Sequence, residues 1–363
     1  MQSNETAVYD AIKMHFDRDK RRIKFIAYLI VALLKLTDAS LAQWAIAINQ
    51  STQRLSRFKR LQRFLMQFQF SAKLYARLIW QQYGQGKEVV LTLDCTEYQQ
   101  GSVWIQFLVL GIAHQRMSIP LLWHSANRDG NCTDIARKTI LRSLMRWIKP
   151  QPHQRIYITA DREFVGPEFR HKSLAVWGLI PVIRIRANAV VTHRGRSQKV
   201  AKLFDCPHWR LLRQPRKVYG SSLYLAGKRL ADGDFLIVYS DRYVSGIGRL
   251  YGQRWGIETL FGAYKSRGFH LESCRVVAHD RLRCLLFVLS LSLVWAIQTG
   301  QWLIRQGQAI PQRLVKAANQ AEATAGATKR NVYSLFRHGL DELRDRVLGN
   351  RPLSQLVPLL SCH

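Results

Sequence analysis

The sequence predicts an α/β protein with a mixed β-sheet, a helical N-terminal region and a β-rich insertion. Residues 87–185 alternate short apolar, β-prone runs with segments of helical periodicity, which is the pattern of an α/β domain. Residues 1–86 instead carry apolar side chains at helical spacing. Between residues 186 and 245, short β-prone runs alternate with glycine-containing turns, so we expect a mostly β insertion there.

The N-terminal region, residues 1–86, is expected to be helical. Its helices are predicted at Lys24–Leu36, Leu41–Ile48 and Gln53–Phe64. The third has apolar residues on one side and basic residues on the other. Such a helix packs through one face and offers cations on the other, which suits docking on a polyanion. A solvated basic helix has the same pattern, so both interpretations stay open.

The α/β domain is expected in two parts, residues 87–185 and 246–310, on either side of the insertion. The first part is predicted to hold strands at Lys87–Leu93, Trp104–Ala113, Ser118–His124, Arg155–Ala160 and Ile180–Ile185, and helices at Asn131–Lys149 and Pro167–Trp177. The second part begins with a helix at Tyr251–Lys265 and continues as apolar helices. A helical C-terminal region, residues 311–363, is predicted to hold a linker or solvated helix at Ala317–Thr328 and a last helix at Arg330–Leu348.

The charge balance is strongly basic. Among 363 residues there are 55 Lys+Arg against 24 Asp+Glu, for a net charge of +31. Lys and Arg that neutralise phosphates supply most of the non-specific affinity of proteins for nucleic acid, so the excess favours a polyanionic partner. A ribosome-like or membrane-surface basic protein is the alternative.

The cysteines indicate neither a zinc ribbon nor a secreted protein. There are six, at Cys95, Cys132, Cys206, Cys274, Cys284 and Cys362, and none forms a C-x2-C pair. Separate thiols in a chain of this length fit a reducing cytoplasm, where we expect the protein. The apolar runs Phe25–Leu34 and Leu285–Ile297 are short, so we interpret both as buried helices and expect no membrane association.

The stretch Tyr251–Lys265 carries an unusual set of polar side chains. Tyr251, Arg254, Glu258 and Lys265 have the spacing Y-x2-R-x3-E-x6-K. At about 100° per residue, a single helix would place all four in one narrow stripe. A carboxylate, two cations and a phenol beside apolar surface suit a site that holds a metal and grips phosphate. A solvated helix face with i,i+4 ion pairs is the plainer alternative.

Two predicted strands are followed by carboxylates, Asp94 and Asp161. Ligand sites in α/β sheets gather at strand ends, and neighbouring strands lie about 4.8 Å apart. If the two strands are neighbours, these aspartates share one cation, and Glu258 supplies a further oxygen ligand. Mg²⁺ prefers such oxygens and leaves positions open for phosphate. A single aspartate after a strand is also common as a turn or cap residue.

These motifs together resemble the DDE transposases of bacterial insertion sequences, of the insertion-sequence-four type. The spaced signature described above matches at every position. The stretch Asp94-Cys95-Thr96 is similar to the first-aspartate motif of that family. Ala160-Asp161-Arg162-Glu163-Phe164 is similar to the second, with Glu163 where the family commonly has glycine. The resemblance covers roughly residues 87–345.

The resemblance implies an RNase H-like catalytic domain and cut-and-paste transposition, in which element ends are nicked, pass through hairpins and are joined to target DNA. It implies that Asp94, Asp161 and Glu258 hold Mg²⁺, with Mn²⁺ as a substitute. It also implies double-stranded DNA (terminal inverted repeats and target) and a second copy, in a synaptic homodimer, as partners. The expected DNA-contacting residues are Tyr251, Arg254, Lys265, Arg162 and Trp209.

Three points stay open at this stage. Trp209 is a candidate to stack on a flipped base, but a core position in the β-rich insertion is the alternative. An RNase H-like nuclease or resolvase would cut DNA without joining it. A non-catalytic relative would bind DNA and need no metal.

Overall fold

The computed structural model describes residues 3–16, 19–48, 51–166, 178–315, 328–353 and 355–356. The chain divides into two compact units. Unit 1 contains residues 1–74, 98–103 and 261–363, and unit 2 contains residues 75–97 and 104–260. The predicted helix Pro167–Trp177 lies outside the described residues, as does most of the predicted linker Ala317–Thr328.

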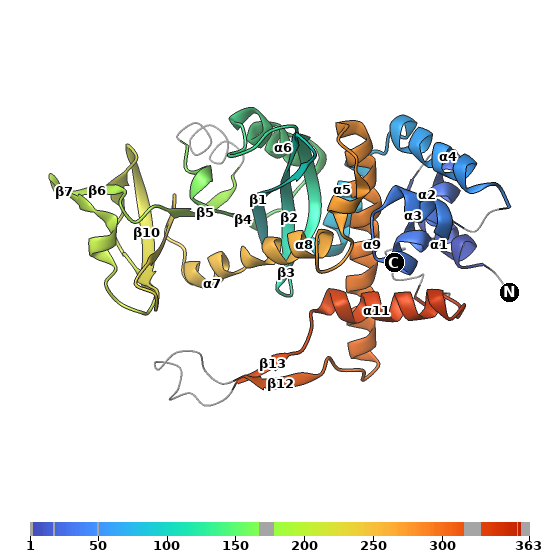
Figure 1. Ribbon diagram of the computed structural model, residues 1–363. Coiled ribbons are helices and arrows are strands. Elements are labelled where there is room, and N and C mark those ends of the chain that lie inside the picture. The colour runs from blue at the N-terminus through green and yellow to red at the C-terminus, as the bar shows by residue number, and fades with distance from the viewer. Residues whose placement is uncertain are drawn as a thin grey trace. The chain divides into compact units, whose positions relative to one another are not determined.

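The dominant element of unit 2 is an 11-stranded sheet in the order β3-β2-β1-β4-β5-β11-β10-β9-β6-β7, with β8 paired to β10 (Figure 1). Its strands are β1 Glu88–Gln100, β2 Val103–His114, β3 Met117–Ala126, β4 Arg155–Ala160, β5 Ile180–Ile185, β6 Val190–His193, β7 Arg196–Lys199, β8 Arg210–Leu211, β9 Arg216–Val218, β10 Ser221–Arg229 and β11 Phe235–Ser240. Strands β1, β4 and β5 are parallel, whereas β2 with β3 and β5 with β11 are antiparallel. The predicted mixed α/β sheet is therefore confirmed.

The β-rich insertion continues the central sheet. Strand β11 pairs with β5, with Val238 opposite Arg184, and β10 pairs with β11 on the other side. This pairing joins segments that are about fifty residues apart in the sequence, and local sequence patterns do not show it. The insertion is thus anchored to the strand that follows the second aspartate motif.

The segment predicted as one helix at Tyr251–Lys265 consists of two helices, so that prediction was wrong. Helix α7 spans Ile247–Gly252 and helix α8 spans Trp255–Tyr264. Between them the backbone bonds join residues three apart, from Arg254 N to Tyr251 O at 2.9 Å and from Ile257 N to Arg254 O at 3.0 Å. This tighter, 3₁₀-like winding separates the two α-helical segments.

Helix α7 packs on the sheet through a buried apolar cluster. Ile247, Leu250 and Tyr251 from α7 lie against Val182 of β5 and Val238 of β11. On the other side of the break, α8 approaches β3 closely at Gly256. A Cβ atom there would lie 2.7 Å from the carbonyl carbon of Met117, so only glycine fits this approach. Packing before and after the break thus fixes where Arg254 and Glu258 lie.

Unit 1 is mostly helical. Its helices are α1 Asn4–Ile12, α2 Lys20–Leu36, α3 Leu41–Ala47, α4 Arg54–Gln67, α9 His279–Arg305 and α11 Leu335–Leu348, with a hairpin of β12 Gln312–Val315 and β13 Thr328–Asn331. Helix α11 crosses α9 and packs against it (Figure 1), and Gly339 of α11 lies against the Ala296 carbonyl. Helix α11 begins five residues after the predicted start at Arg330, because β13 occupies the preceding residues.

Helix α9 is longer than the apolar run predicted at Leu285–Ile297. It has 27 residues and, by length and composition alone, is apolar enough to cross a membrane. However, 89% of its most apolar window is buried inside the protein, where α2, α4 and α11 pack on it. That is the environment of a core helix. The pair α2 and α3 also passes the composition test, but the two helices are bent by 102° at their break.

Candidate active site

The sheet brings the two predicted aspartates to neighbouring positions. Strands β1 and β4 pair in parallel, and Leu93 opposite Ala160 is the last pair. Asp94 and Asp161 are the next residues on the two strands. Asp161 immediately follows β4 and precedes a short 3₁₀ turn, Arg162–Phe164. The sequence predicted that the first strand stops before Asp94, and that prediction was wrong. Strand β1 continues to Gln100, and Asp94 lies where the pairing of β1 with β4 stops.

Glu258 of α8 joins the site through Arg254. Arg254 Nη1 donates a 2.8 Å hydrogen bond to Asp94 Oδ2, and Arg254 Nη2 donates a 2.6 Å hydrogen bond to Glu258 Oε1. The arginine is 5% exposed, so its charge is held away from solvent between the two acids. One guanidinium therefore links the first aspartate with the glutamate of the spaced signature.

The site is an unfavourable place for negative charge. Burial raises the pKa of Asp94 to about 6, while Arg254 and the Cys95 backbone N–H oppose that rise and Asp161 and Glu258 add to it. Burial likewise raises the pKa of Glu163 to about 7, against the opposing charge of Arg137. Carboxylates that are buried together gain strongly from a further cation, so the group is electrostatically prepared for one.

Asp161 has an acceptor that suits a cation. Its Oδ1 atom is buried and has no hydrogen-bond partner among the described residues. A buried carboxylate oxygen without a donor is costly unless a ligand satisfies it. With Asp94 on the adjacent strand and Glu258 linked through Arg254, the available donors are carboxylate oxygens. Oxygen ligands of this kind fit a hard divalent ion such as Mg²⁺ or Mn²⁺.

The four residues of the spaced signature do not fall into one unit. Tyr251 is buried in unit 2, and its ring centroid lies 5.9 Å from the guanidinium carbon of Arg254. Lys265 lies in unit 1, where its Nζ is 3.5 Å from Glu272 and 5.9 Å from the Tyr98 ring centroid. The structure thus gathers Tyr251, Arg254 and Glu258 in unit 2.

The two remaining predicted DNA contacts lie in different surroundings. Arg162 lines a cavity of about 420 Å³ together with Arg184 and Arg186, which gives that hollow a basic wall. Trp209 packs beside the apolar cluster beneath α7, and a Cβ atom on Gly248 would lie 2.5 Å from its ring. The contact with Gly248 favours the packing role for Trp209 that was the alternative in the sequence.

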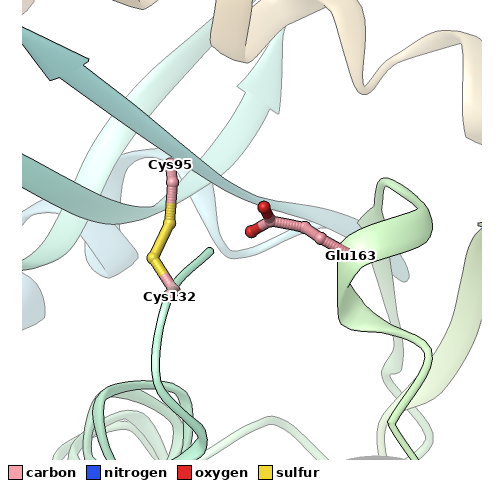
Figure 2. Close-up of side chains that lie close together, drawn as sticks. All are labelled: Cys95, Cys132 and Glu163. Atoms are coloured by element: carbon pink, nitrogen blue, oxygen red, sulfur yellow. A yellow bond between two sulfur atoms is a disulfide. The ribbon is translucent and has the colours of Figure 1, made fainter. Parts of the chain in front are cut away.

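Two further features beside the aspartates were not predicted from the sequence. Cys95 and Cys132 form a disulfide, so the expectation of separate thiols was wrong for this pair (Figure 2). The two cysteines lie 37 residues apart in the sequence, and spacing alone does not predict such a bond. Arg137 of α6, Asp134–Trp147, is a buried arginine whose Nη2 lies 3.8 Å from Glu163 Oε1. Because basic residues on helices are usually exposed, the sequence alone does not predict that Arg137 is buried.

Carboxylates brought together at adjacent strands can hold divalent metal ions, and such ions promote displacement at phosphodiesters. The transposase DDE domain family matches residues 114–295, half of the chain, and the chain belongs to that family. It is a DDE transposase, an enzyme that cleaves and joins DNA strands with divalent metal ions. Asp161 and Glu258 fall inside the matched segment, and Asp94 precedes it.

Other comparisons are distant. The cryo-EM structure of a piggyBac transposase synaptic complex with hairpin DNA matches with a TM-score of 0.44 and 11% sequence identity, over 94% of this chain and 73% of that chain. No curated protein matches the chain.

Proposed function

We propose that the protein is a transposase of the insertion-sequence-four type, which cuts an element out at its ends and joins it to target DNA. Asp94, Asp161 and Glu258 hold Mg²⁺, with Mn²⁺ as a substitute. One observation carries this proposal: Arg254 bridges Asp94 and Glu258, residues 160 and 4 positions away, while Asp161 continues the neighbouring strand. Arg254 and Glu258 of the spaced signature thereby meet the first aspartate motif, and the second lies on the neighbouring strand.

The chain's own residues divide the work. The metal ions, when bound, activate a water or 3′-hydroxyl and stabilise the leaving oxygen. The partly buried carboxylates would hold those ions, and both aspartates immediately follow the last residues of the β1–β4 pairing. Arg254 holds two of the acids in place beforehand and, with Tyr251, is assigned to the phosphate of the cleaved end. Lys265, in unit 1, is assigned a separate contact with DNA phosphates.

The DNA partner is supported by charge. The chain carries a net charge of +31, and Arg162, Arg184 and Arg186 line the basic cavity described above. Double-stranded DNA binds such surfaces mainly through its phosphates. The substrates are the terminal inverted repeats and the target, and two protomers bring two ends together. The ends pass through hairpins, and the protein acts in the cytoplasm.

Three assays test this function. Purified protein is mixed with element-end DNA and Mg²⁺ or Mn²⁺, and nicking, hairpin formation and strand transfer are scored separately. A transposase yields all three. Cutting without transfer would indicate an RNase H-like nuclease or resolvase, and tight metal-independent binding without cutting would indicate a regulatory relative. Flanking inverted repeats in the encoding DNA supply the substrate.

A further inference from the structure

The Cys95–Cys132 disulfide lies directly beside the proposed metal site. Cys95 follows Asp94 in β1, and the Cys95 backbone N–H donates a 2.9 Å hydrogen bond to Asp94 Oδ1. The Cα atoms of the two cysteines lie 6.9 Å apart. Figure 2 shows the Glu163 carboxylate pointing toward the sulfur atoms. A movement of the peptide at Cys95 would therefore change the hydrogen bond to Asp94, a carboxylate that would hold metal.

The second cysteine connects this bond to the Asp161 motif. Cys132 precedes Thr133, the N-cap of α6. From α6, Arg137 reaches the 3₁₀ turn that follows Asp161: its Nη2 lies 3.8 Å from Glu163 Oε1, and its guanidinium carbon lies 4.5 Å from the Phe164 ring centroid. A continuous series of contacts therefore runs from Asp94 through the disulfide and α6 to the turn after Asp161.

The segment that carries Cys132 is also held without the sulfur–sulfur bond. Gly130 N donates a 3.1 Å hydrogen bond to Glu97 Oε2, and the Gln106 side-chain amide donates to Gly130 O. Cys132 Sγ lies 3.2 Å from Gln106 Oε1, which would accept from the thiol once it is reduced. The two thiols thus stay near each other after reduction, so the bond can re-form readily.

We propose that Cys95 and Cys132 form a redox-active pair whose state sets the metal affinity of the adjacent carboxylates. In the oxidising direction, the thiolate of one cysteine attacks a low-molecular-weight disulfide and releases one thiol. The other cysteine then attacks the mixed disulfide, forms the Cys95–Cys132 bond and releases the second thiol. The protein loses two electrons and two protons, and the external disulfide gains them. A small dithiol reverses the reaction.

The disulfide form binds metal more tightly. The bond fixes the peptide that donates to Asp94 and ties it, through α6, to the turn after Asp161, so the two aspartates are held in one arrangement. Reduction removes the covalent part of that restraint and leaves the weaker hydrogen bonds at Gly130. Outer contacts that orient metal ligands change metal affinity by roughly tenfold or more. In cytoplasmic proteins, disulfides are usually transient and serve catalysis or redox sensing. The inference rests on the proposed metal site.

The experiment has two readouts on the full chain. The first equilibrates the protein in glutathione buffers of graded composition, traps free thiols by alkylation and maps them by mass spectrometry. The second measures Mn²⁺ binding by electron paramagnetic resonance in the oxidised and reduced forms. Cys132→Ser removes the pair. Cys206→Ser, a free cysteine elsewhere in unit 2, is the matched control.

The expected result is reversible formation of the Cys95–Cys132 bond and Mn²⁺ binding that weakens roughly tenfold on reduction in wild type and Cys206→Ser. In Cys132→Ser, binding should be weak and independent of the redox buffer. Equal Mn²⁺ affinity in both forms of the wild type overturns this inference alone. Absence of Mn²⁺ binding in both forms contradicts the proposed metal site and, with it, this coupling.

A zinc site is the other chemistry that this cluster offers. The ligand atoms of Cys95, Cys132 and Glu163 all lie within 4.8 Å of one another, and thiolates with a carboxylate suit Zn²⁺. The discriminating arm adds Zn²⁺ to the reduced protein before oxidation. Stoichiometric Zn²⁺ that blocks disulfide formation in wild type but not in Glu163→Gln would overturn the redox assignment in favour of a metal site.

Discussion

Arg254 donates a 2.8 Å hydrogen bond to Asp94, a residue 160 positions earlier in the chain. The other end of the same guanidinium binds Glu258 at 2.6 Å. In the protein without bound metal, Arg254 is therefore the cation that balances two of the three acids. This contact is within unit 2 and depends on the break between α7 and α8, which directs Arg254 toward β1.

Replacing Arg254 should destabilise the metal-free protein and divalent metal should restore part of the loss. Arg254→Ala leaves the partly buried Asp94 without its partner, and breaking such a pair costs about 2–3 kcal/mol because both acids keep some contact with solvent. Urea unfolding with and without Mg²⁺ measures the effect. Arg254→Lys keeps the charge but cannot donate to both acids from one planar group, so its unfolding free energy should lie between those of wild type and Arg254→Ala. Equal stability of Arg254→Ala and wild type in the absence of metal would refute the bridging role.

A methyl group at Gly256 should move α8 away from β3. The added Cβ would meet the Met117 carbonyl carbon at 2.7 Å and its oxygen at 2.9 Å, and both are backbone atoms that cannot swing aside. Gly256→Ala should cost about 1–3 kcal/mol in unfolding free energy and weaken metal binding, because Glu258 lies on the same helix. Gly252→Ala is the matched control, since a Cβ there meets no atom within 4 Å. A neutral Gly256→Ala would mean that α8 is not held by this contact.

The raised pKa of Asp94 predicts a definite pH dependence. A carboxyl group with a pKa of about 6 in the folded protein and an ordinary value near 4 when unfolded binds more protons in the folded state. The metal-free protein therefore loses stability as pH rises between those values. Relative to Asp94→Asn, which does not titrate, wild type should lose roughly 1 kcal/mol between pH 5 and pH 7.5.

Urea unfolding of both proteins across that pH range provides the measurement. Taking the difference cancels the contributions of titrating groups that do not interact with Asp94. A difference that is flat, or that increases toward neutral pH, would show that Asp94 is not buried as the structure has it.

Lys265 should contribute to DNA affinity without being needed for the metal site. It lies in unit 1 beside Glu272, and its side chain is 23% exposed. Lys265→Ala should weaken binding of element-end DNA and make the plot of log affinity against log salt shallower by about one unit. Lys13→Ala removes another cation that is paired with an acid in unit 1, Asp10, and serves as the control. An unchanged salt slope for Lys265→Ala, with a changed slope for Lys13→Ala, would remove Lys265 from the DNA-contacting set.

Much of the sheet was predictable because its strands coincide with short apolar, β-prone runs in the sequence. Strands β4 and β5 have the predicted bounds. Asp94 and Asp161 were expected to lie together if their strands were neighbours, and β1 and β4 do pair. The pairing of β11 with β5 was not predictable, since it depends on partners far apart in the chain. Sequence patterns report burial and periodicity, and they do not report which distant strand lies alongside.

The signature segment shows the same limit in the site. Its spacing correctly linked Arg254 with Glu258, because residues four apart meet across either a regular or a slightly tightened turn. The single stripe including Lys265 assumed uninterrupted α-helix. The backbone winding at Arg254 depends on packing against Met117 and the cluster under α7, which no local pattern encodes. The Cys95–Cys132 bond was missed for the same reason.

The central claim is that Asp94, Asp161 and Glu258 together hold the metal that cleaves DNA. The most direct measurement is the cleavage rate of element-end DNA in Mg²⁺ and in Mn²⁺ by wild type and by Glu258→Gln, with end binding measured in parallel. Glu258→Gln should bind the DNA ends but cut them about a thousandfold more slowly with either metal, since losing a metal ligand removes several kcal/mol of transition-state stabilisation. Cleavage at the wild-type rate by Glu258→Gln would contradict the assignment.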